Sequence, residues 1–458
     1  MLEGIKKKEN LRYVAVYADI IVLYHIVMRE YYGDTLAYFA RVIQHMGISS
    51  LASELHIRYL TWTSRVLVEV PLFILSHGMH MVLFGLCNVF VHVLLLLALM
   101  KLTDYKHNLV LVSLMLLYPV SLMADTGWMT AYITYFWPLS LGIASIVSLK
   151  KLYDGEKISV FELIFFFLCQ IYGTNLEVCA VFYTCILTTV VIMMLWGKRF
   201  TAGSFVLVAI QYLICAGNIV FALTCPGNAA RKLSNIDYWF PSYTSMTFID
   251  KVVVAVNSAV SYLISSDLYW IILSVVILTF SCVIYKSETQ KIMISALPLS
   301  SALVLTLGKA FTRIYYPEMV ELFDDFAGRK YVDPTNYISP SVYIPFVLYV
   351  IILCAIFVAL MNMFEDVKKS FFICAVIASG LVSRLTLGFS PTVYASGVRT
   401  FIFMDFAMIF VIITIYDTLK EKVHISEKTF TILRCVLLMI SFFAVLANII
   451  AICSIYYY

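Results

Sequence analysis

Charged residues are scarce in this sequence, and long polar stretches are missing from it. Only 13% of the 458 residues are Asp, Glu, Lys or Arg, whereas 62% are hydrophobic, and the mean hydropathy is +0.92. This composition excludes a soluble protein, because a soluble fold needs a largely polar surface. No stretch is polar enough for a separate soluble domain, so we predict a single multi-span membrane domain over residues 1–458.

Motifs of metal and redox chemistry are also missing. The 11 Cys and 8 His form no CxxC pair, no zinc spacing and no HExxH motif. Asp324 and Asp325 offer one place for a divalent cation, but adjacent carboxylates also cap or solvate helices. We therefore predict no metal site and no required cofactor, and the divalent cation stays an alternative.

The sequence also lacks an internal repeat and a cleavable signal peptide. Two related halves with Gly- or Pro-broken helices would favour a transporter, and no such symmetry is present. The basic residues 1–12 precede an apolar run that is longer than a signal-peptide core and has no small-residue cleavage site. We expect the first helix to stay as an anchor.

Apolar runs of about 20 residues, the length that crosses a bilayer as a helix, recur along the chain. We predict an all-α, polytopic integral membrane protein with about 13 transmembrane helices. The expected spans are 12–28, 79–100, 108–123, 131–148, 158–173, 177–196, 203–224, 267–285, 292–312, 342–363, 370–388, 400–417 and 429–452.

The basic residues are distributed by membrane side, so the net charge of +4 does not indicate nucleic-acid binding. Lys and Arg gather in every second loop, at 6–12, 101–106, 150–157, 198–199, 286–291, 368–369 and 420–428. The positive-inside rule makes these loops cytoplasmic, with the amino terminus inside. We expect a multi-pass protein of the plasma (inner) membrane whose partner is the lipid bilayer and not a nucleic acid.

The opposite loops are longer, and long loops often carry binding and catalytic residues. The expected outer segments are 29–78, 225–266 and 313–341. In the first of them, apolar and aromatic residues recur at helical spacing, which predicts one or two helices lying at the membrane interface. We therefore expect the active site on the outer face.

The stretch YYGDTLAYFARV, residues 31–42, places one carboxylate among aromatic residues directly after the first span. This carboxylate, Asp34, precedes an apolar-periodic run, so capping of a helix amino terminus is one explanation. A catalytic base is the other. At the sequence level both interpretations of Asp34 stay open.

Arginines form a candidate anion site. Arg58 and Arg65 lie on one helical face with Trp62, and guanidinium groups beside an aromatic ring suit a phosphate with an apolar tail. Contact with lipid phosphates is the alternative. Arg231 follows a Pro-Gly turn that could cradle a phosphate. Arg399 opens the twelfth span, either as part of this site or as a snorkelling anchor.

Aromatic, amide and acidic side chains form a candidate sugar or acceptor site. Tyr and Trp rings pack against sugar rings, although an aromatic belt at the membrane interface explains some of them. In GTNLEVC, Asn175 either binds a ligand or caps the next span, as Thr174 could. The candidates are Tyr38, Trp62, Asp125, Trp128, Tyr132, Asn175, Glu177 and Asn228.

Five elements occur in order along the chain: an Asp after the first span, LTWTSR, W…Y…YFWPL, NLE and CPGNAAR. In this order they resemble a bacterial family, the DUF6056-type membrane proteins and the related serotype-converting glucosyltransferases of the GT-C glycosyltransferase class. The similarity covers residues 31–232, with a weaker echo at SPTVYASGVR.

The resemblance implies a GT-C-like fold and transfer of a monosaccharide from a polyprenyl-phosphate sugar donor on the outer face. The glycan acceptor belongs to the cell surface. The resemblance places the base at Asp34, and the chemistry assigns the phosphate to Arg58, Arg65, Arg231 and Arg399. The family often has two adjacent acids where this chain has Asp34 and Thr35, so Glu54, Glu69 and Asp125 are reserve bases.

Direct displacement at the sugar predicts an inverting reaction. Two alternatives stay open beside the transferase. One is a polysaccharide polymerase or ligase acting on lipid-linked oligosaccharide. The other is a flippase for lipid-linked oligosaccharide, which needs a polar path across the bilayer.

Overall fold

The computed structural model of the chain describes residues 8–30, 33–36, 50–285, 288–316, 335–422 and 427–455. Within these residues every regular element is a helix and no strand occurs, so the all-α prediction is confirmed. Eleven of the described helices are long and apolar enough to cross a membrane. Such helices pair their backbone N–H and C=O groups internally, which the bilayer requires.

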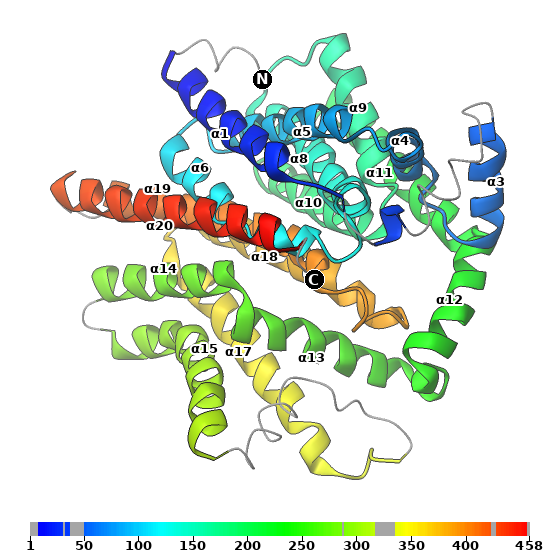
Figure 1. The fold of residues 1–458 in the computed structure, drawn as a ribbon. Coiled ribbons are helices and arrows are strands. Elements are labelled where there is room, and N and C mark those ends of the chain that lie inside the picture. Colours follow the sequence, from blue (N-terminus) through cyan, green and yellow to red (C-terminus); the bar gives the residue numbers. More distant parts are fainter. Residues whose placement is uncertain are drawn as a thin grey trace. The chain divides into compact units, whose positions relative to one another are not determined.

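The eleven candidate spans are distributed over the whole described chain (Figure 1). They contain α1 (Lys8–Val27), α5 (Met81–Leu102), α8 (Trp137–Asp154), α10 (Glu177–Trp196), α11 (Ala202–Thr224), α13 (Phe248–Ser266), α15 (Thr289–Tyr315), α17 (Ile344–Met363), α18 (Val367–Leu385), α19 (Ile402–Lys422) and α20 (Glu427–Ser454).

Shorter helices connect or extend these spans. They are α3 (Leu51–Thr61), α4 (Val66–Ser76), α6 (Asn108–Leu116), α7 (Trp128–Ala131), α9 (Val160–Gly173), α12 (Pro226–Trp239) and α14 (Leu268–Ile284). Single helical turns are η4 (Val120–Met123), η5 (Tyr132–Phe136), η6 (Pro241–Ser245), η9 (Pro340–Val342), η10 (Thr386–Phe389) and η11 (Val398–Phe401).

The expected set of spans and the observed helices differ in two ways. The runs expected at 108–123, 158–173 and 267–285 form the shorter helices α6, α9 and α14. The segment 225–266, expected as an outer loop, contains α12 and the candidate span α13. Polar residues such as Asp250 and Asn257, both buried, interrupt the apolar pattern of α13, so the length of its apolar runs does not predict a span.

Unit 1 of the chain comprises Met1–Arg231, Val398–Ile402 and Ile425–Tyr458. In it, α8 packs against α5, α9 and α10, while α1 packs against α5 and α20. Figure 1 shows α1, α5 and α8 as neighbouring helices. Helix α8 is buried along most of its length, so it forms the centre of this unit.

Glycine permits the tight packing of α9 on α8. A Cβ atom added to Gly173 would lie 2.9 Å from the backbone N of Gly142 and 2.9 Å from the carbonyl O of Pro138. Backbone atoms cannot yield as the end of a flexible side chain can. A larger residue at 173 would therefore push the two helices apart.

The basic loops of unit 1 gather at one end of its helices. Lys101 of α5 pairs with Glu156 at 2.6 Å, and Lys151 of α8 pairs with Glu162 at 2.6 Å. Arg199, just after α10, donates a hydrogen bond to a carbonyl in the last turn of α8 at 3.3 Å. These contacts join the carboxyl ends of α5, α8 and α10. The amino ends of α8 and α10 therefore lie at the opposite end of unit 1.

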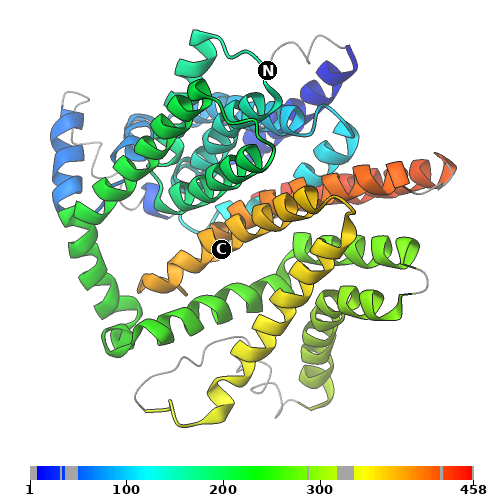
Figure 2. The ribbon, with the colours of Figure 1, turned by 180° about the vertical axis from the view of Figure 1, so that it is seen from behind.

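Unit 2 comprises Lys232–Gly397 and Phe403–His424. Helix α13 packs against α15, α17 and α18, and Figure 2 shows α17, in yellow, crossing α13, in green. In α19, Asp405 hydrogen-bonds to Asp267, whose carboxylate caps α14 by accepting the N–H groups of Tyr269 and Trp270.

Candidate functional site

The candidate site lies at the end of unit 1 that is opposite to the basic loops. It combines the residues after α1, the turn between α3 and α4, the turn between α9 and α10, and the start of α12. Residues just before α7 and in η11 complete it. Segments far apart in sequence thus bring their polar residues to one region.

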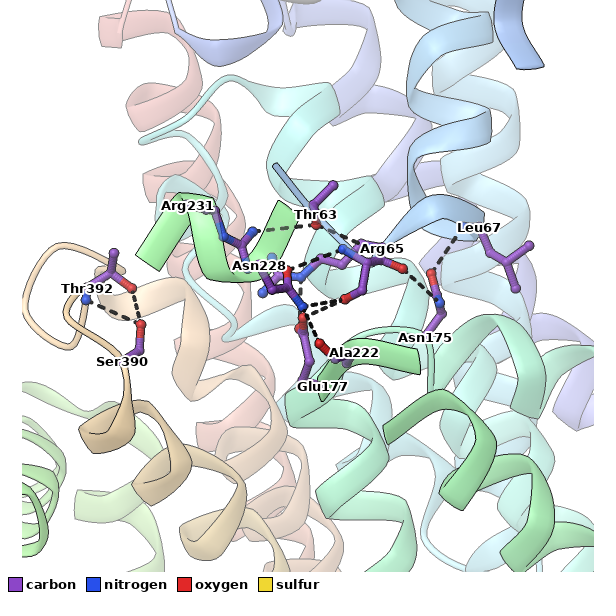
Figure 3. Close-up of polar contacts among 11 residues, drawn as sticks. Thr63, Arg65, Leu67, Asn175, Glu177, Ala222, Asn228, Arg231, Ser390 and Thr392 are labelled. Atoms are coloured by element: carbon purple, nitrogen blue, oxygen red, sulfur yellow. Dashed lines mark hydrogen bonds and ion pairs between the residues drawn. The ribbon is translucent and has the colours of Figure 1, made fainter. Parts of the chain in front are cut away.

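An ion pair joins the α3–α4 turn to α10. The Nε of Arg65 lies 2.9 Å from an Oε of Glu177 (Figure 3). The hydroxyl of Ser64 donates to the other Oε of Glu177 at 3.2 Å. Burial acts to lower the pKa of Arg65, but the charge of Glu177 and hydrogen bonds to Glu177 and Tyr135 outweigh it and raise that pKa above its ordinary value. Arg65 is therefore a permanent cation.

Two asparagines hold this turn in place. Asn228 of α12 donates to the Ser64 hydroxyl at 2.9 Å and to the carbonyl of Ala222 at 2.8 Å. Asn175 accepts the backbone N–H of Leu67 at 3.1 Å (Figure 3). Asn175 does not cap α10, because the residue at the cap position is Leu176 and no side chain bonds there. Both asparagines instead position Arg65.

Arg231 differs from the other arginines of the site. Its guanidinium donates to Asn228 at 3.2 Å and reaches the Thr63 hydroxyl at 3.5 Å (Figure 3), and it forms no ion pair with any residue that the structure describes. Burial, followed by the positive charge of Arg65, lowers the pKa of Arg231. Its charge is the least compensated in the site and is suited to an anion.

A second ion pair joins η11 to the residues before α7. Arg399 pairs with Asp125, and its guanidinium carbon lies 5.3 Å from the centre of the Tyr135 ring. Tyr135 hydrogen-bonds to both Arg399 and Arg65. The chain of contacts Glu177, Arg65, Tyr135, Arg399 and Asp125 is therefore continuous. The Nε of Arg399 is buried and has no partner among the described residues.

Asp34 follows α1 and lies near this network. Asp34 is exposed, and its carboxylate makes no hydrogen bond or ion pair with the described residues. Partial desolvation by the protein raises its pKa above the ordinary value, the charge of Arg399 opposes this, and the charge of Asp125 adds to it. The alternative role of Asp34 as a helix cap concerns the run that follows it, and residues 37–49 of that run lie outside the described residues.

Arg58 has a different environment. It forms a two-pronged ion pair with Glu69, with one contact from Nε at 2.5 Å, and both side chains are more than 90% buried. The pair ties α3 to α4. Arg58 and the reserve base Glu69 thus satisfy each other. Glu54, the other reserve on α3, is also buried.

The aromatic residues predicted to contact a sugar differ in how deeply they are buried. Trp62 is 40% exposed at the end of α3, where a ligand can reach it. Trp128 and Tyr132 are buried in the core of unit 1, with Tyr132 packed between the rings of His25 and His92. A sugar would reach these two rings only if they became exposed. Tyr38, Asp324 and Asp325 lie outside the described residues.

The Pro-Gly element expected to cradle a phosphate has another role. Pro226 and Gly227 form the first turn of α12. A Cβ atom on Gly227 would lie 2.7 Å from the backbone N of Thr63 and 2.7 Å from the carbonyl O of Tyr59. The space above Gly227 is filled by backbone, so the glycine lets α12 dock on the end of α3.

Several residues of the site were not among the predicted ones. Tyr135 lies between Arg65 and Arg399, and Ser64 bonds to Glu177 and Asn228. Glu30 and Thr35 contact the first turn of α7. The sequence does show that polar residues flank Asp34, with Glu30 four residues before it and Thr35 directly after it. Their partners are about 100 positions away, which no local pattern reveals.

Among the described residues, no group of three or more His, Cys, Asp and Glu side chains is arranged to hold a metal ion. The described side chains of the site offer carboxylates, guanidinium groups, amides, a phenol and hydroxyls. Comparison of the chain with protein-family models, with curated proteins and with solved structures finds no match.

Proposed function

We propose that this protein is a membrane glycosyltransferase with a GT-C-like fold. It moves a monosaccharide from a polyprenyl-phosphate donor to a cell-surface glycan on the outer face of the membrane. The observation that carries the proposal is the placement of Asp34, an exposed carboxylate without a partner among the described residues, near the paired Arg399 and Asp125. A catalytic carboxylate has to be accessible and free to accept a proton.

The reaction assigns a step to each kind of group. Asp34 takes the proton of the acceptor hydroxyl as that oxygen bonds to the anomeric carbon of the sugar. The bond from the anomeric carbon to the phosphate oxygen breaks, and its electron pair leaves with the lipid phosphate. A raised pKa makes Asp34 a stronger base than an ordinary carboxylate. Attack from the side opposite to the leaving group inverts the anomeric centre.

Arg231 and Arg399 are suited to the charge that grows on the leaving phosphate. Arg231 has no carboxylate partner among the described residues, and Arg399 keeps a buried Nε without one. Guanidinium groups placed before the reaction stabilise developing negative charge without reorganising. Arg65 keeps Glu177 as its partner and adds positive potential.

The donor class follows from this charge balance. Three of the four arginines face a carboxylate, namely Glu69, Glu177 or Asp125, and only Arg231 does not. A phosphodiester carries one negative charge and a diphosphate linkage carries two. Asp34 loses its own charge when it takes the proton of the acceptor, so one guanidinium is then left without a carboxylate charge to balance it. This single charge favours a monophosphate donor, which a transferase uses, over the diphosphate donor of a polymerase or ligase.

The convergence of the motif residues also supports the proposal. LTWTSR, NLE and CPGNAAR, which carry the resemblance in sequence, supply Arg65, Glu177, Asn228 and Arg231 to one network. The basic loops lie at the other end of the same helices. With those loops cytoplasmic, the site faces outward.

The purified full chain tests the proposal in a transfer assay. It is incubated with membrane glycan acceptor and radiolabelled sugars linked to polyprenyl monophosphate or to polyprenyl diphosphate. We expect label to enter the glycan from a monophosphate donor, with inversion at the anomeric carbon. Transfer from diphosphate donors alone would overturn the proposal in favour of a polymerase or ligase. Movement of lipid-linked sugar across vesicles without any glycosidic product would indicate a flippase instead.

A further inference from the structure

Two residues on either side of Asp34 bind the beginning of α7. Glu30 accepts the backbone N–H of Trp128 at 2.8 Å with one carboxylate oxygen and that of Met129 at 3.0 Å with the other. These N–H groups belong to the first turn of α7, where helical N–H groups have no partner inside the helix. Glu30 therefore caps a helix whose sequence lies about 100 residues away.

Thr35 makes the second attachment. Its side chain is fully buried, and its hydroxyl lies 2.8 Å from the hydroxyl of Thr130. The same hydroxyl accepts the backbone N–H of Thr130 at 3.3 Å. Because Asp34 lies between Glu30 and Thr35 in the chain, both of its flanks are fixed to one turn of α7.

Glycines let the two backbones approach at this place. A Cβ atom on Gly33 would lie 2.8 Å from the backbone N of Gly127. Gly127 has a φ of +92°, which side-chain-bearing residues rarely adopt, and its own Cβ would meet the Thr35 hydroxyl at 2.5 Å. The segment 33–35 and the residues 126–130 are therefore in direct contact.

We infer that Glu30 and Thr35 are positioning residues that fix the catalytic carboxylate Asp34 beside Asp125 and Arg399. The inference rests on the proposed function, in which Asp34 is the base. Asp34 has no bond of its own to the described residues, so among them the attachments of Glu30 and Thr35 set its place. Asp125 stands two residues before Gly127. The contacts of the Asp34 segment with the first turn of α7 therefore also align Asp34 with the ion pair of Asp125 and Arg399. A catalytic group displaced by about 1 Å can lose about 100-fold in rate.

The test compares Thr35→Val, which keeps the side-chain volume and removes the hydroxyl, with Thr35→Ser, which keeps the hydroxyl. Both are measured as full-length protein in the transfer assay, with kcat and the KM for donor determined separately. We expect Thr35→Val to lower kcat by about 10- to 100-fold while KM changes less than about threefold. Thr35→Ser should recover most of kcat. Thr431→Val, at an exposed threonine of α20, is the matched control and should behave as wild type.

Glu30→Gln is a second, independent variant, so the inference can still be tested if Thr35→Val does not fold. An amide keeps one acceptor oxygen, so one of the two N–H bonds survives and the loss in kcat should be smaller. Equal loss in Thr35→Val and Thr35→Ser, or full kcat in both Thr35→Val and Glu30→Gln, would overturn the inference. Asp34→Asn separates the two ideas. Full activity of Asp34→Asn refutes Asp34 as the base. Loss of activity in Asp34→Asn together with full activity in the Thr35 and Glu30 variants refutes only their role as positioning residues.

Discussion

At the scale of single residues, the arginines of the site differ in what holds them. Arg58 is buried against Glu69, Arg65 and Arg399 face partly exposed carboxylates, and Arg231 faces amide and hydroxyl oxygens. The sequence predicted all four as one set of phosphate ligands. It could not separate them, because Arg65 and its partner Glu177 are 112 positions apart.

Arg58→Gln and Arg231→Gln should therefore fail in different ways. Arg58→Gln leaves Glu69 buried without its cation, so we expect the free energy of unfolding to fall by about 3–5 kcal/mol. Arg231→Gln removes no ion pair with a described residue, so stability should change by about 1 kcal/mol or less. Its kcat should fall by about 100-fold. Thermal unfolding in detergent and transfer kinetics check both. An Arg231→Gln enzyme with wild-type kcat would contradict the assignment.

The pH dependence of transfer should report the surroundings of Asp34. A base must be ionised, and the pKa of Asp34 is raised, so activity is lost on acidification at a higher pH than for an ordinary carboxylate. Asp125→Asn removes a negative charge that raises this pKa, so the acidic midpoint of kcat/KM should move to lower pH. Arg399→Gln removes a positive charge that lowers it, so the midpoint should move to higher pH. The same direction of shift in both variants would contradict this electrostatic account.

At the scale of helices, hydropathy predicted most of the framework but missed α13, which lies in a segment expected as an outer loop. The capping boxes that begin α9 at Ser159 and α13 at Thr247 follow the sequence rule for helix starts. The lengths of α6, α9 and α14 could not be predicted, because a short apolar helix and a full span differ by only a few residues. The π-helical turn η5, which places Tyr132 between two histidines, has no sequence signal.

Glycine substitutions should test the packing of α9 on α8. Gly173→Ala would place its Cβ 2.9 Å from backbone atoms of α8, so we expect a loss of about 1–3 kcal/mol in stability. Gly217 in α11 has no atom within 4 Å of an added Cβ. Gly217→Ala should be neutral, or stabilising by up to about 1 kcal/mol from helix propensity. Thermal unfolding of the two variants measures the difference, and equal midpoints would contradict the packing described for α8 and α9.

At the scale of the whole molecule, the sequence and the structure agree on which helix ends belong together in unit 1. The loops selected by their basic charge contact one another, and the motif residues meet at the other ends of the same helices. Charge patterning can predict this because each crossing reverses the side of the membrane. That the motif residues contact one another could not be predicted from charge patterning and is seen only in the folded structure.

Cysteine labelling of intact cells checks the sidedness. In a variant without accessible native cysteines, Thr61→Cys at the end of α3 should react with an impermeant maleimide. Glu156→Cys, in the loop between α8 and α9, should react only after the cells are permeabilised. Both side chains are exposed, so access and not burial decides the outcome. Labelling of Glu156→Cys in intact cells would place the candidate site on the cytoplasmic side.

The rate of a single round of sugar transfer by Asp34→Asn tests the central claim most directly. Asparagine keeps the size of the side chain and removes its basicity, and Asp237→Asn, at an exposed position of α12, is the matched control. We predict that Asp34→Asn binds donor as the wild type does and transfers sugar about 100- to 10,000-fold more slowly, whereas Asp237→Asn transfers at the wild-type rate. Transfer by folded Asp34→Asn at the wild-type rate would contradict the account.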